Sequence, residues 1–318
     1  MSLQSNQLVL GVDGGGSNTL VSLAVVSAGD EFHIVGRGAA GASNLNSSGL
    51  KAATGQVQLA IQRAFESAGT QPKTVAALCM GMSGAGRIAE QEAWTKWAQV
   101  NKVAERTSIV TDAETVLAAG TPEGFGVAVI AGTGSLAFGK NAAGEMARAG
   151  GWGYLLGDEG SGYQIALAAI KAVLKSVDGR GPETCLQTAL LSTLELDDPQ
   201  AFIGYIYRPE SNRSEIAALS KLVFEAAETG DYVALTILQQ AVEELAGLVK
   251  AVVTRLNFSN ETYALALTGG MLLFQQDYRV SVLERLLQLE ISPSAIECVD
   301  DASLGAIRIA ARLLNEGA

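Results

Sequence analysis

The N-terminal third of the chain alternates between short apolar runs and longer segments in which apolar residues recur with helical spacing. Apolar runs predict strands at residues 8–12, 20–26 and 31–37, and later at 75–82 and 107–112. Helical periodicity predicts helices over residues 49–68, 88–99 and 113–120. Helices between buried strands indicate an α/β fold, in which helices cover a mixed sheet.

The pattern begins again after the turn at residues 121–124. Residues 125–141 repeat the order of apolar run, glycine turn and apolar run roughly 120 residues after its first occurrence, which indicates duplicated domains. We therefore predict domains at residues 1–120 and 121–301, with a C-terminal helix at 302–316 packing back on the first. The rest of the second half predicts three helices and two strands, namely helices 161–176, 214–228 and 231–256 and strands 263–270 and 294–299.

Two glycine-rich turns lie at matching places in the two halves, DGGGSNT at residues 13–19 and GTGS at 132–135. Successive amides in such a turn form an anion-binding nest, and glycine lets phosphate oxygens approach closely. Ser17, Asn18 and Thr19 add neutral donors, and the Asp13 carboxylate suits Mg²⁺. Either turn alone is better explained as an ordinary hairpin, but the pair at matching places favours a polyphosphate site.

Other glycine motifs point less clearly to chemistry. Residues 134–141 fit a P-loop except at Asn141, and residues 36–41 match a dinucleotide fingerprint but precede no helix. We reject both motifs. The TGG at residues 268–270 is consistent with a plain strand-to-helix turn.

Asp112 follows a predicted strand and begins a predicted helix. An N-cap role would explain this position without chemistry, whereas a general base that accepts a hydroxyl proton during phosphoryl transfer is the functional alternative. Glu114 is a rival carboxylate, but an acid in the first helical turn is ordinary.

The segment GGWGYLLGDEGSGY at residues 150–163 combines glycines with Trp152 and Asp158. Sugars favour aromatic faces edged by carboxylates, so this loop is a candidate sugar site, although Asp158 is also consistent with helix-start chemistry. Ser43, Asn44 and Ser83 offer further short polar groups after strands, or form simple turns.

Composition narrows the class of protein. The formal net charge of −11 disfavours nonspecific binding to nucleic acid or anionic membranes. Three scattered cysteines and one histidine, His33, fit neither a disulfide framework nor a zinc site. We expect a cytoplasmic protein without a signal peptide or a transmembrane segment.

Taken together, these motifs resemble the N-acetylglucosamine kinase branch, a BadF-type ATPase family, of the actin-like ATPase superfamily. The resemblance is carried by GVDGGGSNT, GASN, GMSGAGR, TDAE, IAGTGS, GGWGYLLGDEGSGY and LTGGM, in this order. It implies two actin-like (ribonuclease H-like) domains with mixed five-stranded sheets flanked by helices and a cleft between them. Cysteine-based iron–sulfur motifs of the related dehydratase activators are absent from the sequence, so that branch is disfavoured.

The resemblance also implies roles for individual residues. Asp112 is similar to the catalytic base, and Asp13 to the acid on the magnesium side of ATP. The implied cofactor site comprises Asp13, Gly14, Gly15, Gly16, Ser17, Asn18, Thr19, Gly132, Thr133, Gly134, Ser135, Gly269 and Gly270, the last two next to adenosine. The implied substrate site comprises Ser43, Asn44, Ser83, Asp112, Thr133, Gly151, Trp152 and Asp158.

The sequence therefore predicts phosphorylation of an amino sugar by Mg²⁺ and ATP, with N-acetylglucosamine as the first substrate candidate. Glucosamine kinase and an ATPase switch that activates another enzyme are the alternatives. Asn44, Trp152 and Asp158 have no purpose in a pure switch. The resemblance further implies a homodimer.

Overall fold

The computed structural model describes residues 7–27, 31–121, 123–208, 212–258 and 263–315. They belong to two compact units, the first spanning Met1–Ala128, Ala264–Ala266 and Ile296–Ala318 and the second Val129–Tyr263 and Leu267–Ala295. The domain boundary near residue 121 stays a prediction. Residue 122 of the predicted turn and residue 316 of the predicted last helix lie outside the described residues.

The first sheet has five strands in the order β3-β2-β1-β4-β5. β1 pairs antiparallel with β2 and parallel with β4, while β2–β3 is antiparallel and β4–β5 is parallel. The strands are β1 (Gln7–Gly14), β2 (Asn18–Val26), β3 (Phe32–Gly41), β4 (Val75–Met82) and β5 (Ala104–Thr111). All five predicted strands of this half are confirmed, although every one except β4 is longer than predicted.

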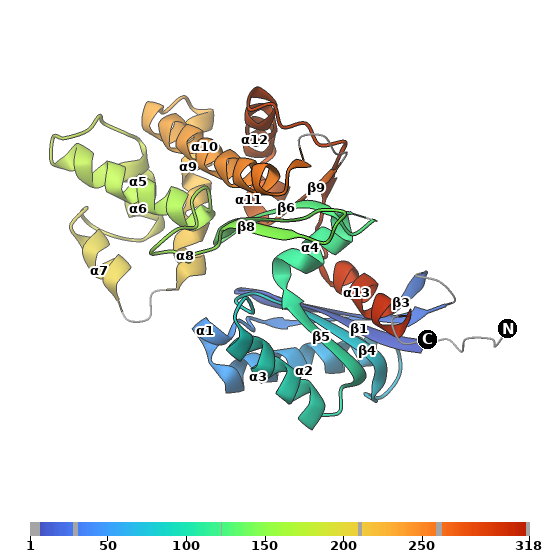
Figure 1. The fold of residues 1–318 in the computed structure, drawn as a ribbon. Coiled ribbons are helices and arrows are strands. Elements are labelled where there is room, and N and C mark those ends of the chain that lie inside the picture. Colours follow the sequence, from blue (N-terminus) through green and yellow to red (C-terminus); the bar gives the residue numbers. More distant parts are fainter. Residues whose placement is uncertain (1–6, 28–30, 122, 209–211, 259–262, 316–318) are drawn as a thin grey trace. The chain divides into compact units, whose positions relative to one another are not determined.

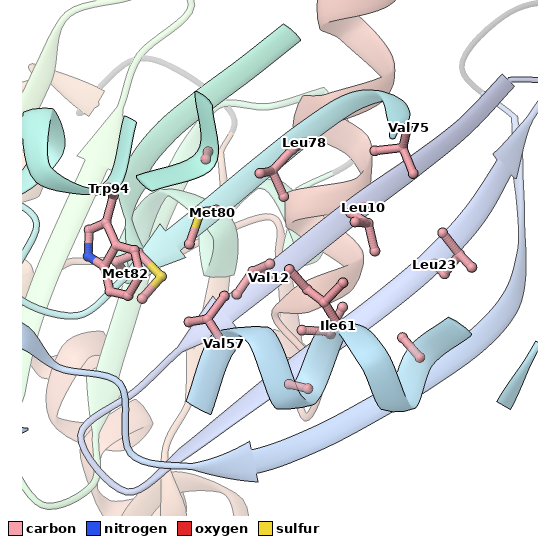
Figure 2. Close-up of a cluster of buried hydrophobic side chains, with 14 of the residues drawn as sticks. Leu10, Val12, Leu23, Val57, Ile61, Val75, Leu78, Met80, Met82 and Trp94 are labelled. Atoms are coloured by element: carbon pink, nitrogen blue, oxygen red, sulfur yellow. The ribbon is translucent and has the colours of Figure 1, made fainter. Parts of the chain in front are cut away.

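Alternating residues of β1 face two separate cores. Leu10 and Val12 pack with buried residues of α2 (Leu50–Ser67) and α3 (Ile88–Val100), as Figure 2 shows. Val9, on the opposite face of the strand, packs with α13 (Ser303–Asn315). Because side chains alternate along a strand, a continuous apolar run is what a sheet buried on both faces requires. In Figure 1, α2 and α3 accordingly lie on one side of this sheet and α13 on the other.

Two glycines of β3 let α2 lie directly on the strand. A Cβ at Gly36 would be 2.1 Å from the Ala64 carbonyl oxygen, and one at Gly38 would be 2.0 Å from that of Ala60. The glycines of residues 36–41 therefore serve helix–sheet packing inside a strand. Rejecting a dinucleotide fingerprint there is confirmed.

α13 lies close against β1 and α4 (Asp112–Gly120). A Cβ at Gly11 would be 2.5 Å from the Ser303 carbonyl oxygen, and one at Gly305 would be 1.9 Å from that of Thr115. These glycines have no room for a side chain, so they fix α13 against the strand. The N-terminus of α13 consequently lies on the face of β1 from which Asp13, two residues beyond Gly11, also projects.

The second sheet has the order β10-β9-β6-β7-β8. Its strands are β6 (Gly126–Ala131), β7 (Ser135–Lys140), β8 (Met146–Gly150), β9 (Ala264–Thr268) and β10 (Ala295–Cys298). Residues 135–140 form strand β7 where a P-loop requires a turn and helix, so rejecting that motif is confirmed. β8, which pairs antiparallel with β7, was not predicted because alternating small residues give its segment little strand signal.

Helices make up most of the second unit. Predicted helices at 161–176 and 231–256 are confirmed as α5 (Gly162–Val177) and α10 (Tyr232–Arg255). The single helix predicted at 214–228 is wrong, since Leu219 separates α8 (Arg213–Ala218) from α9 (Ser220–Glu228). Helices absent from the prediction are α1 (Leu45–Ser48) in the first unit and α6 (Leu186–Thr193), α7 (Ala201–Tyr207), α11 (Gly270–Leu273) and α12 (Gln276–Gln288) in the second.

α12 escaped prediction because its sequence is mostly polar. Its buried residues Tyr278, Val282 and Leu286 nevertheless recur every fourth position, which is helical spacing. The α/β class with two five-stranded sheets flanked by helices is confirmed. Within the described part of the chain, every helix is too short or too polar to traverse a lipid bilayer.

Candidate functional site

Four of the segments singled out in the first half of the sequence meet at one edge of the first sheet. Gly14 of β1 lies opposite Met82 of β4, and Met82 lies opposite Thr111 of β5. At the same edge, Asn18 at the start of β2 pairs with Gly41 at the end of β3. Because the strand ends are in register, the polar residues that follow them are neighbours. Those segments are residues 13–19, 41–44, 81–83 and 111–112.

The first glycine turn is held by backbone hydrogen bonds on both sides. The Gly15 amide donates to the Asn18 carbonyl at 2.8 Å, which closes the hairpin. The amides of Ser83 and Ser43 donate to the carbonyls of Gly14 and Gly15 at 2.8 and 3.1 Å. Two predicted sugar-side loops therefore brace the turn.

The three successive glycines of the first turn differ in how much room the protein leaves for a side chain. A Cβ at Gly14 would lie 2.3 Å from the Met82 methyl carbon, so internal packing excludes a side chain. A Cβ at Gly15 would lie 3.1 Å from the Asn18 carbonyl oxygen, whereas one at Gly16 would meet no protein atom within 4 Å. Packing thus explains Gly14 but leaves Gly16 unexplained. An open position of this kind suits a ligand that approaches the backbone closely.

Thr19 and Ser43 are fully buried beneath this turn. The Thr19 hydroxyl forms hydrogen bonds of 2.7 Å to the Gly41 carbonyl and 2.8 Å to the Ser43 hydroxyl. Their side chains thus support the turn from inside. By contrast, Asn44 and Ser83 are partly exposed, and the Asn44 amide donates to the Ser83 hydroxyl at 3.3 Å. The structure therefore brings these two predicted sugar-side residues together.

Asp112 begins α4, but Thr111 is the N-cap of that helix. Glu114 accepts hydrogen bonds from both the Thr111 amide and the Thr111 hydroxyl at 2.8 Å, completing a capping box. The N-cap interpretation of Asp112 is therefore wrong. Glu114 thus accepts two hydrogen bonds at the helix start, while Asp112 accepts one from the Ala113 amide at 3.0 Å and stays the candidate base by its position at the end of β5.

Asp13 is a partly buried carboxyl in an acidic environment. Burial, followed by the charges of Asp112 and then Asp301, raises the pKa of Asp13 to about 7. A divalent cation would offset this repulsion, and Mg²⁺ commonly binds through one or two carboxylates plus substrate phosphates. Among the described residues, no cluster of three or more His, Cys, Asp or Glu side chains is placed to hold a metal unaided. Asp13 therefore fits a cation that arrives with a polyphosphate.

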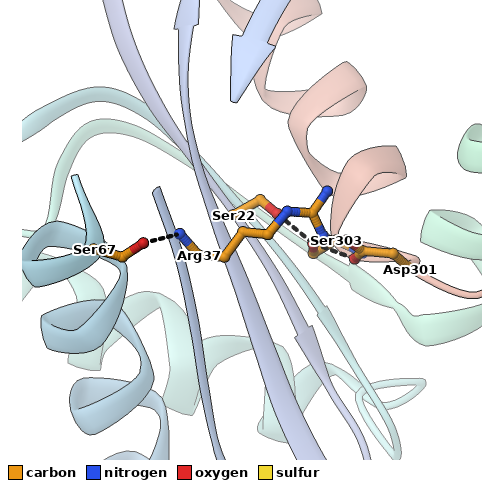
Figure 3. Close-up of polar contacts among 5 residues, drawn as sticks. All are labelled: Ser22, Arg37, Ser67, Asp301 and Ser303. Atoms are coloured by element: carbon orange, nitrogen blue, oxygen red, sulfur yellow. Dashed lines mark hydrogen bonds and ion pairs between the residues drawn. The ribbon is translucent and has the colours of Figure 1, made fainter. Parts of the chain in front are cut away.

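A polar network behind Asp13 was missed in the sequence. Figure 3 shows Asp301 in an ion pair with Arg37 and hydrogen-bonded to the Ser303 hydroxyl. The Ser303 amide also donates to Asp301 at 3.1 Å, and Ser22 and Ser303 share a hydrogen bond of 2.7 Å. These four residues line a cavity of about 180 Å³. An Asp two residues before a helix-starting Ser was the available signal, but only for helix capping.

The second glycine turn joins β6 to β7. The Gly132 amide donates to the Gly134 carbonyl at 2.9 Å, and the Gly162 amide donates to the Gly132 carbonyl at 2.9 Å. The buried Ser135 hydroxyl donates to the Glu159 carbonyl at 2.6 Å. The start of α5 therefore supports this turn, while Gly132, Thr133 and Gly134 remain partly exposed.

Asp158 lies directly against the second turn. It is 7% exposed, its φ is +62°, and its Oδ1 accepts a hydrogen bond from the Ser135 amide at 3.4 Å. Burial raises the pKa of Asp158, and the Ser135 amide and the charge of Arg213 oppose that rise. The Gly151 amide donates to the Ser135 carbonyl at 2.9 Å, while the neighbouring Trp152 is 67% exposed. The predicted sugar loop and the second glycine turn are thus one connected structure.

The third glycine turn contacts the second. Gly269 has a φ of +92°, and a Cβ there would lie 2.3 Å from the Ala131 carbonyl oxygen. A Cβ at Gly132 would come within 3.8 Å of the Gly269 Cα. Gly270 begins α11, and the 80% exposed Phe274 just after it lines a cavity of about 610 Å³ in the second unit. The structure therefore joins residues 132–135 and 269–270, which lie far apart in sequence.

The chain is similar in sequence to known proteins over nearly its whole length. The chain matches the BadF/BadG/BcrA/BcrD ATPase family over residues 10–306. It is 35% identical to the N-acetylmuramic acid/N-acetylglucosamine kinase of Clostridium acetobutylicum, over 95% of this chain and 97% of that protein. It is 34% identical to the N-acetyl-D-glucosamine kinase of Dictyostelium discoideum, over 96% and 98% of the two chains.

A solved structure from Chromobacterium violaceum, of a protein proposed to be an N-acetylglucosamine kinase, is also similar. Its TM-score is 0.78 at 28% identity, covering 95% of this chain and 98% of that one. The predicted fold and family are confirmed, and the family implies use of ATP. The Mg²⁺ requirement, the homodimer, the cytoplasmic location and the individual site residues stay predictions. The match across nearly the whole length of the chain establishes that it belongs to the BadF/BadG/BcrA/BcrD ATPase family.

Proposed function

We propose that the chain transfers the γ-phosphoryl group of ATP to the 6-hydroxyl of an amino sugar, with N-acetylglucosamine as the first candidate. The observation that carries this proposal is the placement of Asp112 at the strand ends beside an open glycine turn and Asp13. The names of the two curated relatives, both N-acetylhexosamine kinases, support an amino-sugar kinase.

Asp112 is the proposed general base. Its carboxylate would orient the sugar hydroxyl and take its proton as the phosphoryl group moves onto the oxygen. Glu114 cannot substitute readily, because both hydrogen bonds of its capping box would have to break. The proposed mechanism therefore depends on a single carboxylate.

The glycine turns are the proposed phosphate holders. Backbone amides at Gly16 and Ser17, and at Thr133 and Gly134, would donate to phosphate oxygens without adding positive side chains to an acidic protein. Mg²⁺, when bound beside Asp13, would supply positive charge to the phosphates. Thr19, Ser43 and Ser135 are buried and would act by fixing the turns.

Adenosine and sugar are assigned to surfaces next to these turns. The cavity beyond Gly269 and Gly270, with the exposed Phe274 ring in its wall, is the proposed place for the adenine base. On the sugar side we propose Asn44, Ser83, Gly151 and Trp152, with Asp158 holding the Trp152 loop against the second turn.

A coupled ADP-release assay tests the function directly. Purified protein with MgATP should release ADP only when an amino sugar is present, and ³¹P NMR of the product should show a 6-phosphate ester. The panel should contain N-acetylglucosamine, N-acetylmuramic acid, glucosamine and glucose. Sugar-independent ADP release would instead support the ATPase switch, and no turnover with any panel member would refute the amino-sugar kinase.

A further inference from the structure

Beside the proposed sugar loop, Arg148 is a cation without an anionic partner among the residues described. It lies on β8, is exposed, and its guanidinium carbon is 5.0 Å from the centroid of the Trp152 ring. At this distance the cation and the aromatic face attract each other. Arg148 forms no ion pair with any residue that the structure describes. Its charge is therefore available to a ligand.

Backbone contacts place this pair beside the second glycine turn. Gly150, at the end of β8, lies opposite Leu136 of β7, and the Gly151 amide donates to the Ser135 carbonyl. Positive φ angles of +73° and +69° at Gly150 and Gly151 turn the chain sharply before Trp152. Trp152 and Arg148 consequently belong to the same rigid corner as Gly134 and Ser135.

This position matters for the acceptor, given the proposed function on which the inference rests. If the second turn holds the transferred phosphate, the acceptor hydroxyl must come within about 3–3.5 Å of the phosphorus. The remainder of the acceptor then extends over nearby exposed side chains. Trp152 is 67% exposed and offers apolar surface to a sugar ring, and the Arg148 guanidinium lies over the same indole, 5.0 Å from its ring centroid.

A neutral sugar needs no full positive charge at this place. Guanidinium groups match carboxylates in shape and bind them through two parallel hydrogen bonds. In a chain of net charge −11, an uncompensated arginine at the acceptor surface is a feature that an anionic substituent would use. We infer that Arg148 is a specificity residue that favours amino sugars carrying a carboxylate substituent, such as a lactyl ether, over their neutral counterparts.

The test compares N-acetylmuramic acid with N-acetylglucosamine, which differ by the carboxylate-bearing lactyl group. Wild-type protein should phosphorylate both. Arg148→Gln should lower kcat/KM for N-acetylmuramic acid about tenfold, with less than a twofold change for N-acetylglucosamine. Arg148→Lys keeps the charge but loses the two parallel hydrogen bonds, so its kcat/KM for N-acetylmuramic acid should lie between those of wild type and Arg148→Gln. Arg208→Gln is the matched control, because Arg208 also stacks on an aromatic ring, that of Tyr205, but in another part of the second unit.

The possible results separate this inference from the proposed function. An equal loss for both sugars in Arg148→Gln would mean that Arg148 holds Trp152 or touches phosphate, which would overturn the inference. No change with either sugar would overturn it too. Turnover of N-acetylglucosamine alone by the wild type would reject the inference and leave the kinase intact. Absence of turnover with both sugars would overturn the inference, and only absence of turnover with every sugar of the panel would reject the kinase itself.

Discussion

The two glycine-rich turns have the same strand, glycine, strand pattern, yet their surroundings assign them different work. Asp13 beside the first turn is raised in pKa by burial and by two other carboxylates, so its charge is not neutralised within the protein. Burial raises the pKa of Asp158 beside the second turn as well, but the Ser135 amide, which donates a hydrogen bond to Asp158, and the charge of Arg213 oppose that rise. A cation beside the first turn would therefore reduce the repulsion between Asp13 and the other two carboxylates. The acid beside the second turn instead binds the backbone of its own turn.

The glycines of the two turns also differ in what surrounds them. In the first turn Gly14 is fixed by Met82 and Gly16 is open, whereas in the second Gly134 faces the Asp158 carboxylate and Gly132 faces Gly269. The same sequence pattern thus forms two different turns. The first has an open glycine beside a carboxyl that other acids repel, and the glycines of the second lie against other residues of the protein. The following variants test this difference.

The largest effect is expected at Asp112. Asp112→Asn removes the proposed base while keeping its shape, so kcat should fall by about 10²–10⁴ with nearly unchanged sugar affinity. Steady-state kinetics and calorimetric sugar binding provide the two measurements. Glu114→Gln is the control, because a Gln side chain still completes the capping box, so stability should change by less than about 1 kcal/mol and kcat should stay within a few-fold. Wild-type turnover in Asp112→Asn would contradict the base assignment.

The next effect concerns the pH dependence of stability at Asp13. Its folded pKa of about 7 exceeds the unfolded value near 3.8, so the folded state keeps a proton that the unfolded state has lost. The free energy of unfolding should therefore fall as pH rises from about 4 to 7. Asp13→Asn should remove this fall in the free energy of unfolding. At pH 8 the variant's free energy of unfolding should exceed that of wild type by a few kcal/mol.

Urea denaturation of apo protein at pH 5 and pH 8 measures this difference. Asp197→Asn, at an exposed carboxylate, serves as the control. MgADP should stabilise wild type more than Asp13→Asn. Equal pH dependence in wild type and Asp13→Asn would show that Asp13 carries no unfavourable charge.

The successive glycines of the first turn should separate folding from binding. Gly14→Ala forces a methyl group against Met82 and should cost about 1–3 kcal/mol of stability. Gly16→Ala has room for the methyl group, so its melting temperature should stay near that of wild type while the KM for ATP rises about tenfold. Thermal melts and ATP titrations distinguish the two, and a normal KM for ATP in Gly16→Ala would remove the phosphate role of that position.

The smallest predicted effect is at the network behind Asp13. Asp301→Asn leaves Arg37 unpaired and should weaken binding of Mn²⁺, used in place of Mg²⁺, in the presence of ADP. Arg37→Gln leaves the charge of Asp301 uncompensated and should strengthen Mn²⁺ binding. Each variant should change the Mn²⁺ affinity about threefold to fivefold at low salt. Electron paramagnetic resonance of free Mn²⁺ provides the measurement. Because both variants break the same ion pair, a purely structural role would shift both affinities in the same direction.

Sequence patterns predicted strongly periodic elements well and weakly periodic ones poorly. β1, with apolar residues on both faces, and α10, with an apolar stripe along its length, were clear. β8 and α12 were missed because their burial depends on neighbours, β7 for one and α10 for the other, more than on their own composition. The site followed the same division: Asp112 and the glycine turns were visible as motifs, whereas Asp301 and Arg148 are ordinary charged residues in sequence.

By itself the sequence determined the alternation of strands and helices and the positions of the glycine turns, because local backbone chemistry and periodicity are encoded by neighbouring residues. The family followed from the resemblance that the ordered motifs carry. Tertiary structure decided which glycine packs against a buried side chain and which acid caps a helix. It also decided that Asp301 lies near Asp13 and that Arg148 lies over Trp152. These are contacts between residues distant along the chain or around a sharp turn, and their energies depend on burial and separation in space, which no local pattern specifies.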